Sequence, residues 1–391
     1  MNLRLLTASA VALLLAACGG QDEPVAETAQ VDAAEALHAL FDEHFERQLE
    51  MNPLQATFIG DYRFNDRLAN SYSPEYRAAE QAMDEEFLAR LLEIDRDQLG
   101  EQDQLSYDIF RLNREQSLEG NEFPFHLVPV NQFYLYTNFF AQLGSGSSAH
   151  PFKTVKDYED FLSRADQAAE IVDQIIANMK DGMREGVVQP RILMEKMIPQ
   201  VEAHVVDNVE DSLFYTPVRN MPEDFSEEDR ARLTAAYEDK IANVIVPAYA
   251  RLANFVGDEY LEASRETVGL YAQPNGESWY EYMVRIRTTT DMTPDEIHQV
   301  GLDEVARIHG EMHTVFEEVG FAGVLKVFFE FVNSDPQFFF DEPVQLIQGY
   351  RDMADHINPL AEDLFETFPK TDVEVRRVEP FREKSASGGS Y

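Results

Sequence analysis

The side chains best suited to chemistry in this sequence are two histidines four residues apart, in the run His309-Gly310-Glu311-Met312-His313. On a helix such a pair is about 6 Å apart at Cβ and could share a metal ion. In an H-E-x-x-H zinc site, however, the glutamate follows the first histidine directly, about 100° round the helix. Glu311 lies two residues on, about 200° from His309, and points to the far side. We therefore expect no catalytic metal here, and a solvated or core-edge pair instead.

Two residues near this pair bear on the same question. His298 lies on nearly the same stripe, but eleven residues of helix place it roughly 16 Å from His309, so one ion cannot bind both. Gly310 lowers the local helix propensity by about 1 kcal/mol, which suggests that a neighbouring element packs closely against it.

A second group of candidates precedes that helix. Residues 279–290 combine one tryptophan (Trp279), two tyrosines (Tyr280 and Tyr282), one methionine, two arginines and three threonines. Tyr and Arg together suit a site that recognises a carboxylate or a peptide backbone. The alternative is an interface belt between helices, because Tyr and Trp commonly pack with one end in water.

Several other chemistries are excluded. The sequence contains no P-loop, dinucleotide glycine fingerprint, EF-hand loop or G-x-S-x-G elbow. The acid excess, 72 Asp plus Glu against 32 Lys plus Arg with a formal charge of -40, argues against a nucleic-acid partner, which needs a basic face. With 44% hydrophobic residues the chain can still bury a sizeable core.

The single cysteine has a different role. A short apolar run over residues 5–17 ends in Leu15-Ala16-Ala17-Cys18, which resembles a bacterial lipoprotein box. We predict that residues 1–17 are a signal peptide and that Cys18 carries the lipid anchor, with an ordinary signal and an incidental cysteine as the alternative. Gly19 after the cysteine favours sorting to the outer membrane, facing the periplasm. Residues 18–31 read as an acidic flexible tether, and residues 32–391 as one helical domain.

The elements that must position these residues follow a helical period. Asp32 with Glu35, Ser73-Pro74, Ser226 with Asp229, and Thr293-Pro294-Asp295-Glu296 are helix-start signals. Apolar stripes support them: Leu37, Phe41, Phe45 and Leu49 up to Asn52-Pro53; Tyr76, Ala79, Met83, Phe87 and Leu91; and Tyr158, Phe161, Ala165, Ala168, Val172, Ile175 and Met179 up to Gly182 or Gly186. Pro247 should kink the helix that starts at Ser226, and the last helix should run to Val319 before Gly320.

Two regions depart from this period. Residues 121–151 hold many aromatics between prolines and a Gly-Ser run at 144–148, which predicts a loop-rich connection with a buried aromatic patch. Residues 373–378 are β-branched and form the one strand candidate. The fold class is therefore mainly α, with a minor β element near the C-terminus.

Four separated stretches resemble the domain of unknown function 885 family, across essentially the whole mature chain. They are Pro151-Phe152-Lys153-Thr154-Val155 with Asp157-Tyr158, Ile176-Ala177-Asn178-Met179 through Pro190-Arg191, Thr288-Thr289 through Thr293-Pro294-Asp295-Glu296-Ile297-His298-Gln299-Val300-Gly301-Leu302, and Pro369-Lys370-Thr371 through Glu379-Pro380-Phe381-Arg382-Glu383. The resemblance implies a bacterial lipoprotein with a multi-helix, zincin-like metallopeptidase architecture.

One departure from the family limits what can be carried over. The family's H-E-x-x-P-G-H-H metal helix comes after the segment matched by Arg382 to Tyr391, and this chain ends at Tyr391. No zinc ligand or general base is therefore assigned to a position here, and no cofactor is expected in this chain, although zinc is expected in a full-length relative. His309 and His313 match no metal position of the family.

The resemblance predicts that the chain is the N-terminal part of a membrane-anchored zinc peptidase, inactive as it stands. Tyr282, Arg285 and His298 are its candidate substrate-facing residues, and a peptide is the expected substrate of a full-length relative. Such a helical layer should leave an apolar face uncovered, which predicts self-association. The alternative is a non-catalytic helical lipoprotein that binds a peptide or protein partner through the aromatic residues around Phe133 to Phe140.

Overall fold

The computed structural model describes residues 24–378 and residue 389. The predicted signal peptide, Cys18 and the first part of the predicted tether lie outside the described residues. In the described part the chain is helical, and the only β pairing there is an isolated bridge between Pro190 and Arg265. The mainly α prediction is therefore confirmed. The zincin-like architecture is not shown by this fold.

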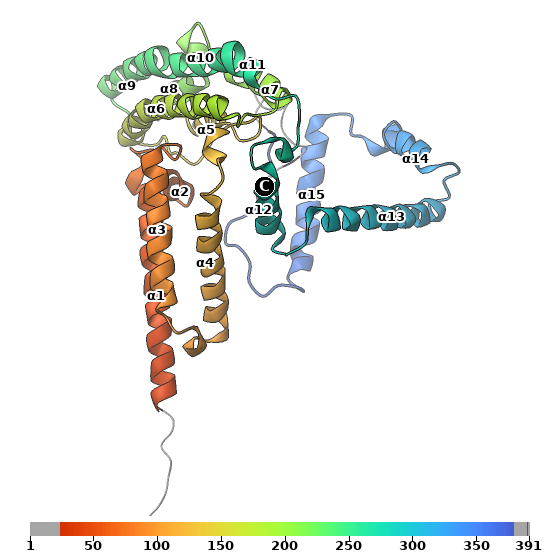
Figure 1. Cartoon of the computed structure of the whole chain (residues 1–391). Coiled ribbons are helices and arrows are strands. Elements are labelled where there is room, and N and C mark those ends of the chain that lie inside the picture. The colour runs from red at the N-terminus through yellow and green to blue at the C-terminus, as the bar shows by residue number, and fades with distance from the viewer. Residues whose placement is uncertain (1–23, 379–388, 390–391) are drawn as a thin grey trace, which may run out of the picture. The chain divides into compact units, whose positions relative to one another are not determined.

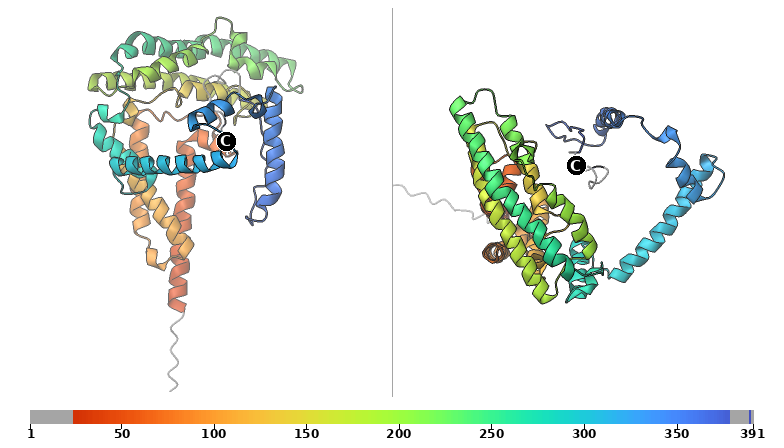
Figure 2. Two further views of the ribbon diagram at one scale, coloured as in Figure 1. Left: turned by 90° about the vertical axis from the view of Figure 1, so that its right-hand side faces the viewer. Right: turned by 90° about the horizontal axis from the view of Figure 1, so that it is seen from above.

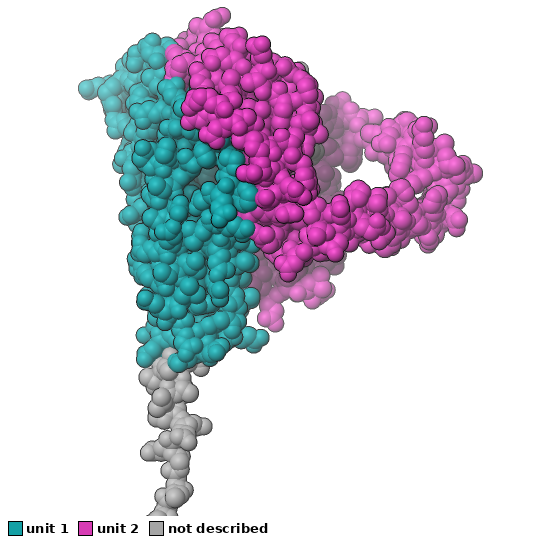
Figure 3. Space-filling model, in the orientation of Figure 1, with its two compact units in different colours: residues 1–129, 142–178, 214–245 teal, residues 130–141, 179–213, 246–391 magenta. Residues whose placement is uncertain are grey.

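The chain divides into two compact units, coloured separately in Figure 3. Unit 1 holds residues 1–129, 142–178 and 214–245, and unit 2 holds residues 130–141, 179–213 and 246–391. The helices of unit 1 are α1 (Pro24–Met51), α2 (Pro53–Phe58), α3 (Pro74–Leu92), α4 (Glu101–Gly120), most of α6 (Val155–Glu185), α8 (Thr216–Arg219) and α9 (Glu227–Lys240). Those of unit 2 are most of α5 (Tyr136–Leu143), α7 (Arg191–Glu202), α10 (Val246–Phe255), α11 (Leu261–Ala263), α12 (Gly276–Thr288), α13 (Pro294–Glu318), α14 (Leu325–Val332) and α15 (Pro343–Ala361).

In unit 1, the helices α1, α3 and α4 lie side by side (Figure 1). Their apolar faces meet in one core cluster, formed by Leu37, Leu40, Met83, Phe87, Leu91, Leu99 and Tyr107. The Ser73 side chain accepts a hydrogen bond from the Tyr76 N–H and starts α3 where the sequence predicted. Phe45, by contrast, is exposed, and Leu40 and His44 take the buried positions of α1 instead.

A second core in unit 1 forms around α6. All seven residues of the stripe predicted for this helix are buried, and the helix ends at Glu185, before Gly186 at φ +76°. Phe161 stacks on Tyr237 of α9 and lies 6.2 Å from Phe214, measured between ring centroids. Gly144 packs into this aromatic cluster, because a Cβ there would lie 2.5 Å from both the Phe161 and Phe214 rings. The glycine of the predicted loop therefore serves close packing.

In unit 2, α7 and α10 pack together through buried apolar residues that include Met194, Met197, Val201 and Leu252. The helix that begins after Ser226, in unit 1, changes to a π-helical segment at residues 241–245, which ends two residues before Pro247. Proline lacks the N–H that would bond to Asn243, so the irregularity falls where the sequence predicted a kink. Figure 2 shows α13 as one straight helix. The predicted capping box forms at its start between Thr293 and Glu296, and Gly320 follows its end with φ +65°.

Two sequence predictions about the ends of the described part are wrong. The helix expected to start at Asp32 starts at Pro24, so residues 24–31 of the predicted tether are helical. A first-turn proline followed by residues such as Ala, Glu and Gln extends the helix beyond the capping signature at Asp32. The strand predicted at residues 373–378 is irregular, because a single β-branched run needs a neighbouring strand and the described part offers it none.

Candidate functional site

Helix α12 carries two of the three candidate substrate-facing residues. It is framed by two residues in the left-handed conformation, Asn275 at φ 53° before it and Thr289 at φ 54° after it. For a β-branched residue such as threonine this conformation is strained, at a cost of order 1 kcal/mol or more. Gly276 makes the entry possible, because a Cβ there would collide with the backbone of Leu270 and Tyr271. The sequence thus fixes both ends of this helix tightly.

The structure brings Tyr282 and Arg285 together. The guanidinium carbon of Arg285 lies 5.9 Å from the centre of the Tyr282 ring, within the range of a cation–π contact. Tyr282 is only 6% exposed and Trp279 is also buried, whereas Arg285 is half-buried. The buried rings fit the interface-belt alternative, and Arg285 is the member of the pair that can reach solvent. His298 lies on the following helix, α13, where its side chain is exposed.

His309 and His313 have no third metal-binding side chain beside them in the described part of the chain. His309 and His313 are both exposed on α13, and Glu311 is held by Arg307 in an ion pair of 2.6 Å. Within residues 24–378 and 389, no group of three or more His, Cys, Asp and Glu side chains is placed to hold a metal ion. The pair therefore does not fit a zinc centre, and we assign it no catalytic step. The prediction that a neighbouring element packs closely against Gly310 is wrong, since a Cβ at this position would meet nothing within 4 Å.

The helices α13 and α15 each expose an apolar stripe. The side chains of the α13 stripe follow one another at steps of three and four residues, and so do those of α15. The α13 stripe consists of Val305, Ile308, Met312, Val315 and Val319, and the α15 stripe of Leu346, Tyr350, Met353, Ile357 and Leu360. Stripes with this spacing are typical of helices that pack along a partner helix.

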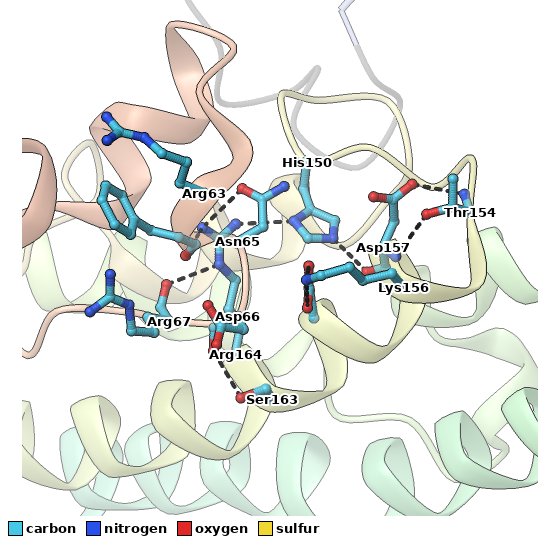
Figure 4. A network of polar contacts seen from close by, with 12 residues as sticks. Arg63, Asn65, Asp66, Arg67, His150, Thr154, Lys156, Asp157, Ser163 and Arg164 are labelled. Atoms are coloured by element: carbon cyan, nitrogen blue, oxygen red, sulfur yellow. Dashed lines mark hydrogen bonds and ion pairs between the residues drawn. The ribbon is translucent and has the colours of Figure 1, made fainter.

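The polar side chains that the structure buries most deeply are different from all these candidates. In unit 1 the guanidinium of Arg164, on α6, is fully buried and ties the residues after α2 to this helix (Figure 4). It donates to the Arg67 carbonyl at 3.0 Å, to the Thr57 hydroxyl at 2.7 Å and to His150 Nδ1 at 3.0 Å. Arg164 lies between Phe161 and Ala168 on the apolar stripe of α6, and an arginine at such a position is the sequence signal from which this network could have been inferred.

The protonation state of His150 follows from these bonds. Its Nε2 lies 2.9 Å from the Asp157 carbonyl, which can only accept, so Nε2 carries the proton and Nδ1 accepts from Arg164. Burial lowers the pKa of His150 to about 4, and the positive charge of Arg164 acts in the same direction. A neutral imidazole with both nitrogens engaged is suited to holding structure and not to proton transfer.

A buried ion pair with an adjoining histidine links the helices α1, α3 and α4 of unit 1. Arg114 Nη1 lies 3.0 Å from Asp84 Oδ1 and 2.5 Å from His44 Nε2. His44 packs edge-on against Phe87 and Phe110, and burial together with Arg114 lowers its pKa to about 4. This group is therefore also a structural tie between helices.

Unit 2 contains a turn that presents two aromatic rings to solvent. Phe133 is 75% and Tyr134 78% exposed, although the sequence predicted a buried aromatic patch here. Phe140, further along the same segment, is buried as predicted. The Asn131 side chain holds the turn, because its Oδ1 accepts from the N–H groups of Phe133 and Tyr134 at 2.8 and 2.9 Å. We refer to residues 131–134 as the aromatic turn.

Known proteins resemble this chain in both sequence and fold. A family model described as "Bacterial protein of unknown function (DUF885)" matches residues 53–391. No curated protein matches the chain. Its fold is similar to that of "the putative lipoprotein from Colwellia psychrerythraea", with a TM-score of 0.80 and 20% identity over 92% of this chain and 64% of the other. The chain thus spans less than two thirds of that structure, and at this identity the likeness shows the fold alone. No helix in the described part is long and apolar enough to cross a membrane.

Proposed function

Since the chain belongs to the DUF885 family, as its sequence motifs predicted, we propose that it forms the helical portion of a lipid-anchored peptidase of the bacterial envelope. The observation that carries the proposal is the fold match over 92% of this chain to the protein described as "the putative lipoprotein from Colwellia psychrerythraea", whose own chain is longer. In this proposal the metal chemistry, polarisation of a peptide carbonyl and activation of water, belongs to the family's metal motif and not to the described residues.

The contribution of the described residues would be recognition. Arg285 is the residue proposed to contact the substrate, because its guanidinium can pair with a peptide carboxylate in a two-pronged hydrogen bond. The buried ring of Tyr282 supports the guanidinium, whose central carbon lies 5.9 Å from the centre of the ring. His298 is retained as a third candidate on the exposed start of α13. The strained Thr289 directly after α12 supports a functional role for this helix, since such strain often accompanies functional sites.

The proposal is tested by assaying the mature chain against a mixture of fluorogenic peptides, with and without a zinc chelator. We expect no chelator-sensitive hydrolysis from this chain by itself. Reading the genomic sequence downstream of Tyr391 in all frames tests the other half, and an H-E-x-x-P-G-H-H segment there would support it. Chelator-sensitive hydrolysis by this chain would overturn the assignment of metal chemistry to the family motif, and its loss in the His309→Ala/His313→Ala variant would place the metal at that pair.

The proposed anchor has its own test. Cys18→Ala should move most of the protein out of the membrane fraction, because the lipid chains provide most of the attachment. The matched control is Ser9→Ala, which lies in the same predicted signal peptide and leaves the lipoprotein box intact. Unchanged fractionation of Cys18→Ala would remove the lipid anchor from the proposal.

The second candidate function is a non-catalytic lipoprotein that binds a peptide or protein partner. The exposure of Phe133 and Tyr134 on a fixed turn favours it, because rigid aromatic side chains are common anchors of binding surfaces. If the downstream sequence holds no metal motif, this candidate becomes the better account.

A further inference from the structure

The aromatic turn lies in an uncharged stretch of a strongly acidic chain. No Asp, Glu, Lys or Arg occurs between Glu122 and Lys153, although the whole chain carries a formal charge of -40. Because the segment carries no such charge, it has no electrostatic attraction for an ionic partner. It also has no charge that would oppose its entry into an uncharged environment.

The turn is anchored at both ends, so its two rings cannot fold back into the protein. Val130 before it and Leu135 after it are buried, while Phe133 and Tyr134 remain exposed between them. The buried amide of Gln189 donates to the Val130 carbonyl at 2.9 Å. The rings are thus presented at low entropic cost for binding, because the backbone that carries them is already fixed.

The polar backbone groups of the turn are largely satisfied within the protein. Asn131 Oδ1 accepts from the N–H groups of Phe133 and Tyr134, and the Asn131 N–H donates to the Tyr134 carbonyl at 3.1 Å. The Gln132 carbonyl accepts from Gln200 Nε2 of α7 at 3.3 Å. A peptide that adds by backbone pairing needs free backbone groups, whereas groups already paired within the protein lower the cost of moving the turn from water into a lipid interface.

We propose that the aromatic turn inserts Phe133 and Tyr134 into the interface of an uncharged, zwitterionic phospholipid bilayer. Phenylalanine supplies the apolar contact, and the tyrosine ring lies with its hydroxyl towards the headgroups, as aromatic residues do at membrane surfaces. The acid excess of the chain selects zwitterionic over anionic lipid. The proposal does not depend on acylation of Cys18 or on peptidase activity, since the turn would bind lipid in either case.

The test uses the mature chain, residues 18–391, carrying Cys18→Ser so that no lipid chain contributes. Flotation with phosphatidylcholine vesicles should carry the protein upward, and Phe133→Ala/Tyr134→Ala should lower its partitioning about tenfold or more. Vesicles rich in phosphatidylglycerol should bind the protein more weakly.

The matched control is Phe339→Ala/Phe340→Ala, which removes two adjacent rings of unit 2. These rings are also more than half exposed, but they directly precede the acidic residues Asp341 and Glu342. This control should leave partitioning unchanged.

A second readout reports on insertion directly. In Tyr134→Trp, brominated phosphatidylcholine should quench the new indole, whereas the buried Trp279 of the parent chain should not be quenched. The proposal is overturned if the parent chain does not float, or if both double variants lose partitioning equally. It is also overturned if immobilised peptides or peptidoglycan retain the protein through Phe133 and Tyr134 while vesicles do not.

Discussion

Replacing Arg164 by methionine should destabilise unit 1 severely. Methionine has similar length and fits an apolar stripe, so the change removes the guanidinium while keeping most of the packing. The carbonyls of Arg67 and Phe64 and the Nδ1 atom of His150 then lose a donor; the bond to His150 is buried and the two carbonyl bonds are part-buried. The change therefore tests whether the network holds the residues after α2 against α6.

The magnitude can be worked from these bonds. Each buried acceptor left without its donor costs about 1–3 kcal/mol, so three acceptors cost about 3–9 kcal/mol. Removing a buried charge returns part of this, because the desolvation of Arg164 is no longer required. We expect a net loss of about 3–5 kcal/mol, a large share of the roughly 5–15 kcal/mol that stabilises a typical domain.

Urea unfolding followed by far-ultraviolet circular dichroism measures this loss, and hydrogen exchange of the amides at residues 57–67 localises it. The matched control is Arg96→Met, which removes an arginine that is 40% exposed and paired with Asp108 at 2.6 Å. A surface pair of this kind contributes about 0–1 kcal/mol. If Arg164→Met costs no more than Arg96→Met, and exchange at residues 57–67 is unchanged, the reasoning is refuted.

Three further predictions concern pH, strain and association. The pKa of His150 is about 4 in the folded protein, against an ordinary value of 6.5. Its contribution to folding stability, about 3 kcal/mol, is therefore present above pH 6.5 and lost as pH falls towards 4. His150→Gln should flatten the pH dependence of urea unfolding over that range, and an equally steep dependence would contradict the assignment. Thr289→Gly should raise the free energy of unfolding by about 1 kcal/mol, because glycine adopts φ 54° without strain. A loss of stability in this variant would show that the backbone of Thr289 is not strained. Light scattering should show that the chain self-associates and that Ile308→Lys/Val315→Lys, in the exposed stripe of α13, reduces this association. The control Asp303→Lys/Glu317→Lys, on the opposite face of α13, should leave the association unchanged. Equal effects of the two variants would implicate net charge instead.

The fold was predictable where local signals and apolar period agree. Ser73, Ser226 and Thr293 each cap the helix that they were expected to start, and the whole stripe from Tyr158 to Met179 is buried. The start of α1 was not predictable from Asp32, because a capping signature also occurs inside a longer helix whose neighbours favour the helical state. The strand at residues 373–378 failed because strand formation depends on a partner that local sequence does not reveal.

The candidate site was predictable only in part. Tyr282 and Arg285 lie three residues apart on a helix, which is enough to place them together. The exposure of Phe133 and Tyr134 was not predictable, because aromatic residues between prolines usually indicate buried packing. The network of Arg164 was missed because its partners come from two other stretches of sequence, one holding Thr57 and Arg67 and the other His150.

The two π-helical segments at residues 241–245 and 256–260 set the phase of the helix between them. A π turn holds one residue more than an α turn, so each segment rotates the residues after it by about 100° relative to a regular helix. Tyr249 and Leu252 of α10 are buried with this rotation in place. A single-residue deletion in residues 241–245 should therefore convert the π turn into an α turn and keep both side chains on the buried face. A relative that lacks the π turn is expected to be one residue shorter there.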